Sequence, residues 1–369
     1  MKQGWKYKPF GEVFPIKMGK TPPRGDKSCW DTKKESENKW VSISDISQNE
    51  GKVIFDTKEY ITDAATEKIF RVKANSLLMS FKLTIGKMAF AGTDLYTNEA
   101  IIAIPENKEY NLKFLYFYLS SYNWSSLTDG NEKIKGKTLN KESIGRIKLP
   151  IIPLSDQQRI VSYLDAEFAK IEALKANAEK QLQAAKDLFQ AALKELLTPK
   201  EGWKEGSVGD FLNFKRGYDL THAQMRGGDI PVAGSNGIIG YHNIATNISP
   251  CITVGRSGSV GKLNIYDKCW AHNTTLYVED FKGNYPYFLV YLIQSLGIAS
   301  YGGGSAVPTL NRNNIHPIKT AVPNITEQQR IADRLDALSA NLKALQTNYT
   351  ETITLCNDLK QALLKKVFG

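Results

Sequence analysis

Two stretches of the chain, residues 155–198 and 326–369, carry apolar or small side chains at alternating spacings of three and four. This period is typical of an α-helix that buries one stripe against a partner helix, as in a coiled coil. Each stretch has about 40 residues, which predicts a helix roughly 60 Å long at 1.5 Å per residue. Pro199 should end the first helix, because proline cannot continue a helix interior.

The ends and the seam of both helices follow from the same pattern. Ser155 and Thr326 are predicted N-caps, each with a glutamine three positions later, as in a capping box. The predicted coiled-coil seam contains Ile160, Leu164, Ile171, Leu174 and Leu188 in the first helix, and Ile331, Leu335, Leu338, Leu342, Leu345 and Leu359 in the second.

The order of the segments fixes the direction in which the helices pair. The first helix leads almost directly from segment 1–154 into segment 199–325, and the second helix leaves that segment. To pair with the first helix the second must run back along it, which predicts an antiparallel intramolecular coiled coil. Two similar domains at opposite ends of such a pair would be related by a pseudo-twofold axis. In the alternative, the stripes bind separate partners or another copy of the chain.

Segments 1–154 and 199–325 show a mixed pattern of short strands, glycine-rich turns and one amphipathic helix each, which predicts an α+β fold. The predicted helices span 112–122 and 285–296. The predicted strands span 39–44, 52–55, 76–80, 87–91, 100–104, 250–254, 262–266 and 274–278. The sequence therefore predicts four parts: domains 1–154 and 199–325, and helices 155–198 and 326–369.

The two halves repeat each other. Matching motifs occur in the same order at separations that fall from 198 to 175 to 171 residues. Examples are Gly4-Trp5-Lys6 with Gly202-Trp203-Lys204, Ile85-Gly86-Lys87 with Val260-Gly261-Lys262, and Gln157-Gln158-Arg159-Ile160 with Gln328-Gln329-Arg330-Ile331. A tandem duplication predicts two similar working ends. The first copy is longer, with nearly all of its extra residues between Lys17 and Ser80.

Charge is unevenly distributed along the chain. Segment 1–154 carries 25 basic and 18 acidic residues and segment 199–325 carries 11 and 8, whereas the helices carry 6 and 7, and 6 and 5. The excess in the two large segments points to a polyanion such as DNA as their partner, although a simple solubility charge stays open.

No run is apolar enough to span a membrane, and no signal segment opens the chain. Four cysteines without a CxxC pair favour reduced thiols in the cytoplasm.

No stretch of the sequence matches a catalytic, nucleotide-binding or metal-binding motif. The stretch from Gly130 to Lys137 resembles a phosphate loop, but its glycines are one residue too far apart. The Asp-x-Lys pairs at Asp31 and Asp56 are common by chance, and four histidines lack metal-ligand spacing. We therefore predict no catalytic residue, no metal site and no bound cofactor.

What remains is a set of basic and polar residues on glycine- or proline-broken loops, which could contact base edges and phosphates. The candidates in the first copy are Lys17, Lys20, Arg24, Ser80, Lys82, Lys87 and Asn98. Those in the second copy are Lys215, Arg216, Arg226, Ser235, Asn236, Arg256, Ser257, Lys262 and Asn273. Each one taken singly could equally be a solvated surface side chain.

At this point the chain resembles a specificity subunit of a type I restriction–modification system. The resemblance rests on Gly4-Trp5-Lys6 with Gly19-Lys20-Thr21-Pro22, on Trp40–Ile46, on Pro231–Tyr241, and on the two Gln-Gln-Arg-Ile helix openings that follow Pro153 and Pro323. Such a subunit has two target-recognition domains held apart by the coiled coil, each reading one half of a split double-stranded DNA site.

The resemblance also implies partners. The coiled coil would dock two modification subunits, which bind S-adenosylmethionine and methylate adenine, and ATP-dependent restriction subunits would join them. This chain would bind neither cofactor. Two other hypotheses stay open at this stage: a stand-alone bivalent DNA-binding regulator, and a coiled-coil interaction scaffold whose basic charge is incidental.

Overall fold

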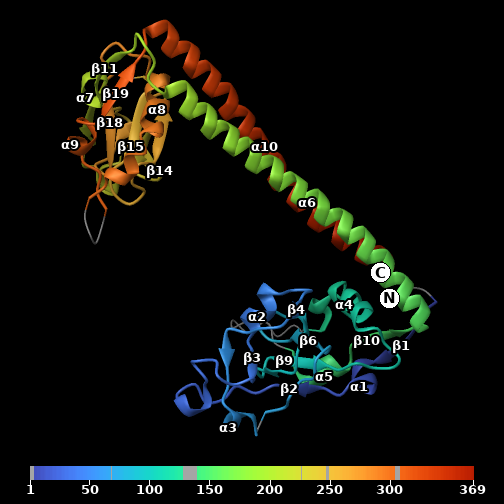
Figure 1. Cartoon of the computed structure of the whole chain (residues 1–369). Coiled ribbons are helices and arrows are strands. Elements are labelled where there is room, and N and C mark those ends of the chain that lie inside the picture. Colours follow the sequence, from blue (N-terminus) through green and yellow to red (C-terminus); the bar gives the residue numbers. More distant parts are fainter. Residues whose placement is uncertain (1–3, 68, 128–138, 226, 247–248, 304–307) are drawn as a thin grey trace. The chain divides into compact units, whose positions relative to one another are not determined.

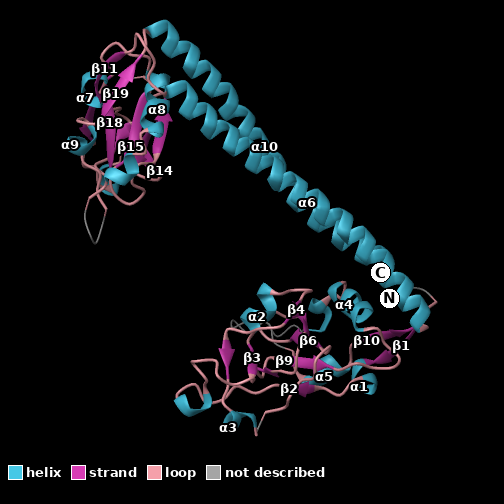
Figure 2. Cartoon of the chain, viewed as in Figure 1, coloured by secondary structure: helices cyan, strands magenta, loops and turns pink. Residues whose placement is uncertain are grey.

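The computed structural model describes residues 4–67, 69–127, 139–225, 227–246, 249–303 and 308–369 (Figures 1 and 2). The chain divides into two compact units. Unit 1 comprises Met1–Ala176 with Thr352–Gly369, and unit 2 comprises Asn177–Glu351. Each unit combines a mixed domain with part of a pair of long helices, so the predicted α+β class is confirmed.

The described residues of unit 1 form three sheets. A five-stranded sheet has the order β2-β9-β6-β7-β4, and a three-stranded sheet has the order β5-β3-β8. A separate antiparallel pair joins the two ends of the domain, β1 (Lys6–Pro9) and β10 (Lys148–Ile151). The other strands are β2 (Lys17–Met18), β3 (Lys39–Val41), β4 (Val53–Ile54), β5 (Glu59–Tyr60), β6 (Leu77–Ser80), β7 (Met88–Ala91), β8 (Tyr96–Thr97) and β9 (Ile101–Ile104).

The core of unit 1 lies between the five-stranded sheet and helix α4 (Leu112–Ser120). Phe114 and Phe117 of α4 are buried there together with Met79 of β6 and Ile102 of β9. Shorter helical segments complete the domain: α1 (Phe10–Val13), α2 (Ile43–Gln48), α3 (Asp63–Thr66), α5 (Lys141–Gly145), and 3₁₀ turns at Lys27–Cys29 and Trp124–Leu127.

Unit 2 repeats this plan with fewer strands. Its sheets have the orders β12-β18-β15-β16 and β14-β13-β17, and β11 pairs with β19. The strands are β11 (Lys204–Ser207), β12 (Asn213–Arg216), β13 (Ile230–Gly234), β14 (Gly237–His242), β15 (Cys251–Gly255), β16 (Leu263–Tyr266), β17 (Trp270–Ala271), β18 (Thr275–Asp280) and β19 (Lys319–Val322). The helices are α7 (Val208–Phe211), α8 (Pro286–Ser295) and α9 (Arg312–Ile315), with 3₁₀ turns at His222–Gln224 and Ile298–Tyr301.

The two domains differ most in one connection. In unit 2, β13 turns directly into its antiparallel neighbour β14 through Ser235 and Asn236. In unit 1, the equivalent strands β3 and β5 are separated by α2 and β4, and β4 adds a strand beside β7. The predicted strand over residues 39–44 ends early because Ser42 and Asp45 form a capping box that starts α2. This insertion lies inside the region where the sequence offsets locate the extra residues.

Helices α6 (Leu154–Leu197) and α10 (Ile325–Phe368) have 44 residues each and pack antiparallel, as predicted (Figure 1). In unit 1, Val161 and Leu164 of α6 are buried in one cluster with Leu364 of α10. In unit 2, Phe189 of α6 is buried in a cluster with Ile331 and Leu335 of α10.

Three of the predicted seam residues are wrong. Leu174, Leu188 and Leu359 are 57%, 60% and 47% exposed. A strict alternation of four and three residues from Ile171 reaches Lys175 and Phe189, and Phe189 is only 6% exposed. Of the other predicted seam residues, Leu164, Ile171, Ile331 and Leu335 are buried, and Ile160, Leu338, Leu342 and Leu345 are half-buried.

Lys360 takes the place in α10 that the sequence pattern gave to Leu359. Its Nζ lies 5.4 Å from the centre of the Phe168 ring of α6, and it forms an ion pair with Glu172. A lysine can fill such a position because its aliphatic stem packs on apolar surface while the ammonium group reaches solvent. A hydrophobicity pattern therefore selects the neighbouring leucine in error.

The predicted N-caps are also wrong, because both helices begin one residue earlier. Ser155 and Thr326 lie inside the first turns, and the Asn324 side chain caps α10 by accepting from the Glu327 N–H at 3.0 Å. The repeated glutamine has a different role. Gln157 is 1% exposed and accepts the N–H of Asn111, the N-cap of α4, at 2.8 Å while donating to the Glu109 and Ile152 carbonyls.

Gln328 repeats this arrangement in unit 2. It is 2% exposed, accepts the N–H of Tyr285, the N-cap of α8, at 2.8 Å, and donates to Asn284 Oδ1 and the Pro323 carbonyl. The first glutamine of each Gln-Gln-Arg-Ile motif thus joins the start of a long helix to the start of the short helix of its domain.

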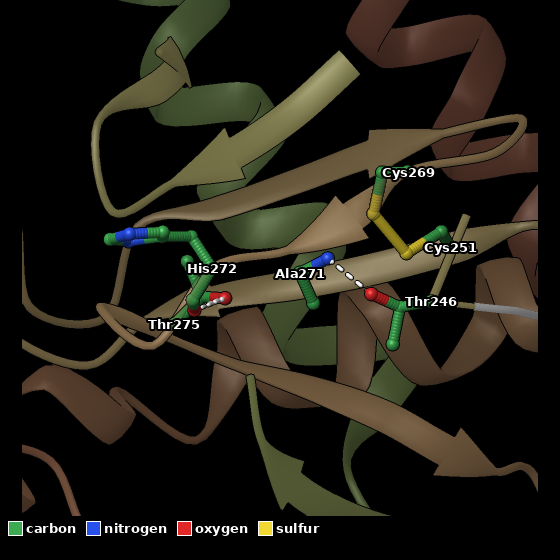
Figure 3. Close-up of a disulfide and its surroundings, with 6 residues drawn as sticks. All are labelled: Thr246, Cys251, Cys269, Ala271, His272 and Thr275. Carbon is green, nitrogen blue, oxygen red and sulfur yellow. Dashed lines mark hydrogen bonds between the residues drawn. A yellow bond between two sulfur atoms is a disulfide. The ribbon is translucent and has the colours of Figure 1, made fainter. Parts of the chain in front are cut away.

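Cys251 and Cys269 form a disulfide in unit 2 (Figure 3), so the expectation of reduced thiols is wrong for this pair. The bond joins β15 of one sheet to the residue before β17 of the other, and both cysteines are buried. Cys29 and Cys356 are free. Within the described ranges, no helix is long and apolar enough to cross a membrane.

Candidate nucleic-acid interface

Each domain presents one loop of the same conformation between two strands of its larger sheet. In unit 1 this loop joins β6 to β7, and in unit 2 it joins β15 to β16. The Gly86 N–H donates to the Ser80 carbonyl at 2.9 Å, and the Gly261 N–H donates to the Gly255 carbonyl at 2.8 Å. The Ser80 and Gly255 N–H groups in turn donate to the Lys87 and Lys262 carbonyls. The two loops, residues 81–87 and 256–262, are named loop 1 and loop 2.

Glycine is required at one position of each loop. Gly86 has φ +81° and Gly261 has φ +79°, a backbone region that residues with a Cβ rarely adopt. A Cβ would also lie 2.3 Å from Trp124 Nε1 in unit 1 and 2.6 Å from Ala299 Cβ in unit 2. The repeated apolar-Gly-Lys motif of the sequence is therefore a turn that the packing behind each loop fixes in shape.

Each loop carries one lysine with a polar partner and one cation that forms no ion pair with another described residue. Lys87 forms an ion pair with Glu50, and Lys262 Nζ donates to the Asn236 carbonyl and Oδ1 at 2.7 and 2.9 Å. Lys262 thereby joins loop 2 to the β13–β14 turn. Lys82 and Arg256 have no ion pair among the described residues, which leaves one cation on each loop outside any ion pair.

Strand β2 with the residues that follow it in unit 1, and strand β12 in unit 2, add further cations to each domain. In unit 1, Lys17 Nζ lies 4.5 Å from the centre of the Phe70 ring, Lys20 is exposed, and Arg24 pairs with Glu59. In unit 2, Lys215 pairs with Glu279 at 2.7 Å, and Arg216 lies 3.8 Å from Asp219. The hydrogen bond from Lys215 to Glu279 raises the pKa of the lysine, so Lys215 stays charged.

Ser80 is a wrong candidate for DNA contact. It is 0% exposed, and its hydroxyl donates to the Thr84 carbonyl inside loop 1. The other polar candidates mostly shape turns. Asn98 Oδ1 accepts the Ala100 N–H, Asn273 donates to Asp219, and the Ser235 N–H donates to Thr274 Oγ1. Ser257 forms a β-bridge with Thr309 and is half-buried.

Two stretches discussed from the sequence lie outside the described residues: the DNA-contact candidate Arg226 and the whole phosphate-loop-like stretch from Gly130 to Lys137. Among the described residues, no group of three His, Cys, Asp or Glu side chains could hold a metal ion.

The candidates predicted from the sequence do not include the exposed apolar residues of β14. Ile238, Ile239 and Tyr241 are 51%, 39% and 52% exposed on this hairpin, next to the turn that Lys262 holds. A two-stranded ribbon fits the major groove of DNA, and apolar side chains can contact the thymine methyl group there. The run Gly-Ile-Ile-Gly-Tyr carried the signal, since it directly follows the polar pair Ser235-Asn236.

Comparison with known proteins decides the family. A model of the type I restriction modification DNA specificity domain matches residues 2–184 and 200–355, once over each half of the chain. The chain belongs to this family. It is thus a DNA specificity subunit of a type I restriction–modification system, a non-catalytic member of such a system.

Two similar proteins are also type I restriction enzyme specificity subunits. The EcoBI specificity subunit of Escherichia coli is 22% identical over 326 residues, covering 72% of this chain and 67% of the relative. A type I restriction enzyme specificity subunit of Haemophilus influenzae is 25% identical over 297 residues, covering 72% and 73%.

Two solved structures share the fold. One comes from work on complex assembly and conformational transition of the type I system, with a TM-score of 0.80, 17% identity and coverage of 100% of this chain and 98% of that one. The other is the HsdS subunit of Thermoanaerobacter tengcongensis, with a TM-score of 0.58, 16% identity and coverage of 100% and 97%.

Proposed function

We propose that this specificity subunit reads a split double-stranded DNA site, with one half-site per domain and a gap that neither domain reads. The observation that carries the proposal is the pair of equivalent loops, loop 1 and loop 2, each with one cation that forms no ion pair among the described residues. The net charges of +7 for segment 1–154 and +3 for segment 199–325 support it, since DNA binding depends on cations.

The different β3–β5 and β13–β14 connections support different half-sites. Equivalent loops on equivalent sheets give both domains the same approach to a groove, while the inserted α2 and β4 change the surface beside loop 1. A pseudo-twofold relation between the domains would then set the half-sites about one DNA turn apart, as for dimeric readers.

The helix pair is the docking surface in this proposal. Two modification subunits bind it, carry S-adenosylmethionine and methylate the DNA, and ATP-dependent restriction subunits join the same complex in the cytoplasm. In unit 1 the helix pair exposes Leu174, Leu355 and Leu359 at 57%, 67% and 47%. The ion pair between Glu172 and Lys360 brings these parts of α6 and α10 to the same level. Exposed leucines of this kind favour a protein partner.

Selection of bound duplexes from a random pool tests the reading of half-sites. With the complex of this chain and its modification subunit, we expect a motif of two short blocks separated by unspecified bases. Arg256→Ala should relax the preference in one block, and Lys82→Ala should affect the other. Each substitution should reduce the discrimination between bases by about 1–3 kcal/mol at the position that its side chain reads.

Lys108→Ala serves as a matched control, because Lys108 is an exposed lysine of unit 1 outside loop 1. If both loop variants changed the same block, or neither changed any, one-domain-per-half-site reading through these loops would be wrong. Failure of the chain to co-purify with any modification subunit would instead favour a stand-alone DNA-binding regulator.

A further inference from the structure

Unit 1 contains a pocket whose lining residues lie outside loop 1. It has a volume of about 640 Å³ and lies where the 3₁₀ turn Lys27–Cys29 meets the end of the α2–β4 insertion. Its lining includes the aromatic side chains of Trp30 and Tyr60 and the cationic side chains of Arg24, Lys27 and Lys58. The pocket is therefore amphipathic, with cations at its rim.

The carboxylates of this pocket are already occupied. Glu59 accepts two hydrogen bonds from the Arg24 guanidinium, and Asp31 accepts the Ser36 N–H at 2.6 Å and the Lys33 N–H at 3.1 Å. Lys27 and Lys58 are both exposed and have no ion pair among the described residues. Two positive charges are thus left without an internal partner around one concave surface.

Arg24 fixes the wall of the pocket rather than offering a free charge. Its guanidinium lies 4.1 Å from the centre of the Trp30 ring and 4.8 Å from that of Trp40, while Glu59 holds its edge. Trp30 and Trp40 pack edge to face at 5.1 Å, and Trp40 is 1% exposed. A stacked and bidentate arginine on a buried indole is preorganised, so this wall of the pocket is rigid.

The pocket is linked to loop 1 through a short chain of contacts. Trp40 Nε1 donates to the Lys20 carbonyl at 3.1 Å, and the neighbouring Thr21 hydroxyl donates to Glu99. Although burial opposes ionisation of Glu99, the Thr21 hydrogen bond and the charge of Lys82 lower the pKa of that carboxyl. Lys82 of loop 1 is thus connected to the wall of the pocket through Glu99, Thr21 and Trp40.

We infer that this pocket binds phosphate groups of the DNA backbone beside the half-site of unit 1, with Lys27 and Lys58 as the contacts. The inference rests on the proposed function and adds a sequence-independent anchor to one domain. Arg24 covers one face of the Trp30 ring, so the ammonium groups rather than a stacked base provide the contact. Because the pocket is built from the longer connections of unit 1, the anchor is specific to that domain.

The test compares wild type with Lys27→Ala/Lys58→Ala in the complete complex. Binding to a random-sequence duplex of about 30 base pairs is measured by fluorescence anisotropy at several salt concentrations. Each phosphate contact contributes about 0.9 to the slope of log affinity against log salt, so the slope of the double variant should be smaller by roughly 1.8. The recognised motif should stay unchanged, because phosphate contacts position the protein and do not read bases.

Lys6→Ala/Lys8→Ala is the matched control, since it removes the same charge from exposed lysines of β1. An equal decrease of slope in the control, or no decrease in the pocket variant, would overturn the inference while leaving DNA reading intact. A wild-type complex that bound no duplex would instead contradict the proposed function.

Lysine acetylation read by mass spectrometry separates the two sources of phosphate. We expect Lys27 and Lys58 to be protected by the duplex and not by inorganic phosphate at matched ionic strength. Equal protection by inorganic phosphate would identify a free-phosphate site and overturn the backbone contact.

Discussion

At the scale of single residues, the repeated Gln-Gln-Arg-Ile motif shows what a sequence pattern can and cannot reveal. The repetition marks both helix openings, and the sequence interprets the second glutamine as part of a capping box. In the structure it is the first glutamine that is buried, because Gln157 and Gln328 accept N–H groups from Asn111 and Tyr285. Both partners lie more than 40 positions away in sequence, so no local spacing rule could have identified them.

Removing either buried glutamine should therefore destabilise its own domain. Gln157→Ala and Gln328→Ala each leave a buried backbone N–H without an acceptor, which costs about 1–3 kcal/mol. The adjacent, exposed Gln158→Ala and Gln329→Ala should change the free energy of unfolding by less than about 0.5 kcal/mol. Urea titration followed by circular dichroism measures the difference, and equal effects of buried and exposed variants would exclude this role.

His316 should make unit 2 sensitive to acid. Its Nε2 accepts the Phe214 N–H at 3.0 Å, which requires the neutral ring, and burial together with Arg312 and Lys282 lowers the pKa of His316 from 6.5. A lowered pKa means that its stabilising contribution is present above pH 6.5 and is lost as the pH falls through the folded value.

The free energy of unfolding of unit 2 should therefore drop as the pH falls below 6.5, and His316→Gln should make that drop shallower. An unchanged pH dependence in the variant would show that His316 does not titrate in this range.

At the scale of elements, the sequence predicted well what depends on local pattern. Both long helices, helices α4 and α8, and the eight strands it located all occur, with ends that shift by at most three residues. Apart from β12, the strands that it missed have two residues or belong to the smaller sheets, such as β5, β8 and β17 with two residues each. Their pairing depends on long-range contacts that no local period encodes.

The helix pair contains apolar residues that are buried and apolar residues that are exposed, and substitutions at the two kinds of position should differ in their effect on stability. Ile171 is 3% exposed, so Ile171→Ala should lower the free energy of unfolding by about 2–4 kcal/mol. Leu174 is 57% exposed, so Leu174→Ala should change it by less than about 0.5 kcal/mol. If the exposed leucines dock a modification subunit, Leu174→Ala should instead weaken co-purification with that subunit. A strongly destabilised Leu174→Ala protein would place this residue on the seam after all.

At the scale of the whole molecule, the duplication is the feature from which the function follows. Family membership establishes a DNA specificity subunit, and in our proposal the two equivalent loops each contact one half-site. The difference between the domains is concentrated in the β3–β5 connection, where α2, β4 and the pocket beside Trp30 belong to unit 1. The sequence located this region from the falling offset but could not show its shape, which depends on β4 pairing with β7.

The helix pair should act as a spacer that sets the gap between the two half-sites. Deleting one heptad from α6 and the facing seven residues from α10 keeps the seam in phase while shortening the pair. Such a variant should methylate sites with an altered gap and unchanged half-sites. An unchanged gap would show that the helices do not set the spacing.

Methylome sequencing of a host that expresses this chain with its modification subunit tests the central claim most directly. The account predicts methylation at one split motif, with two defined blocks separated by a gap of fixed length and free sequence. A single continuous motif, or methylation unaffected by the removal of this chain, would contradict it.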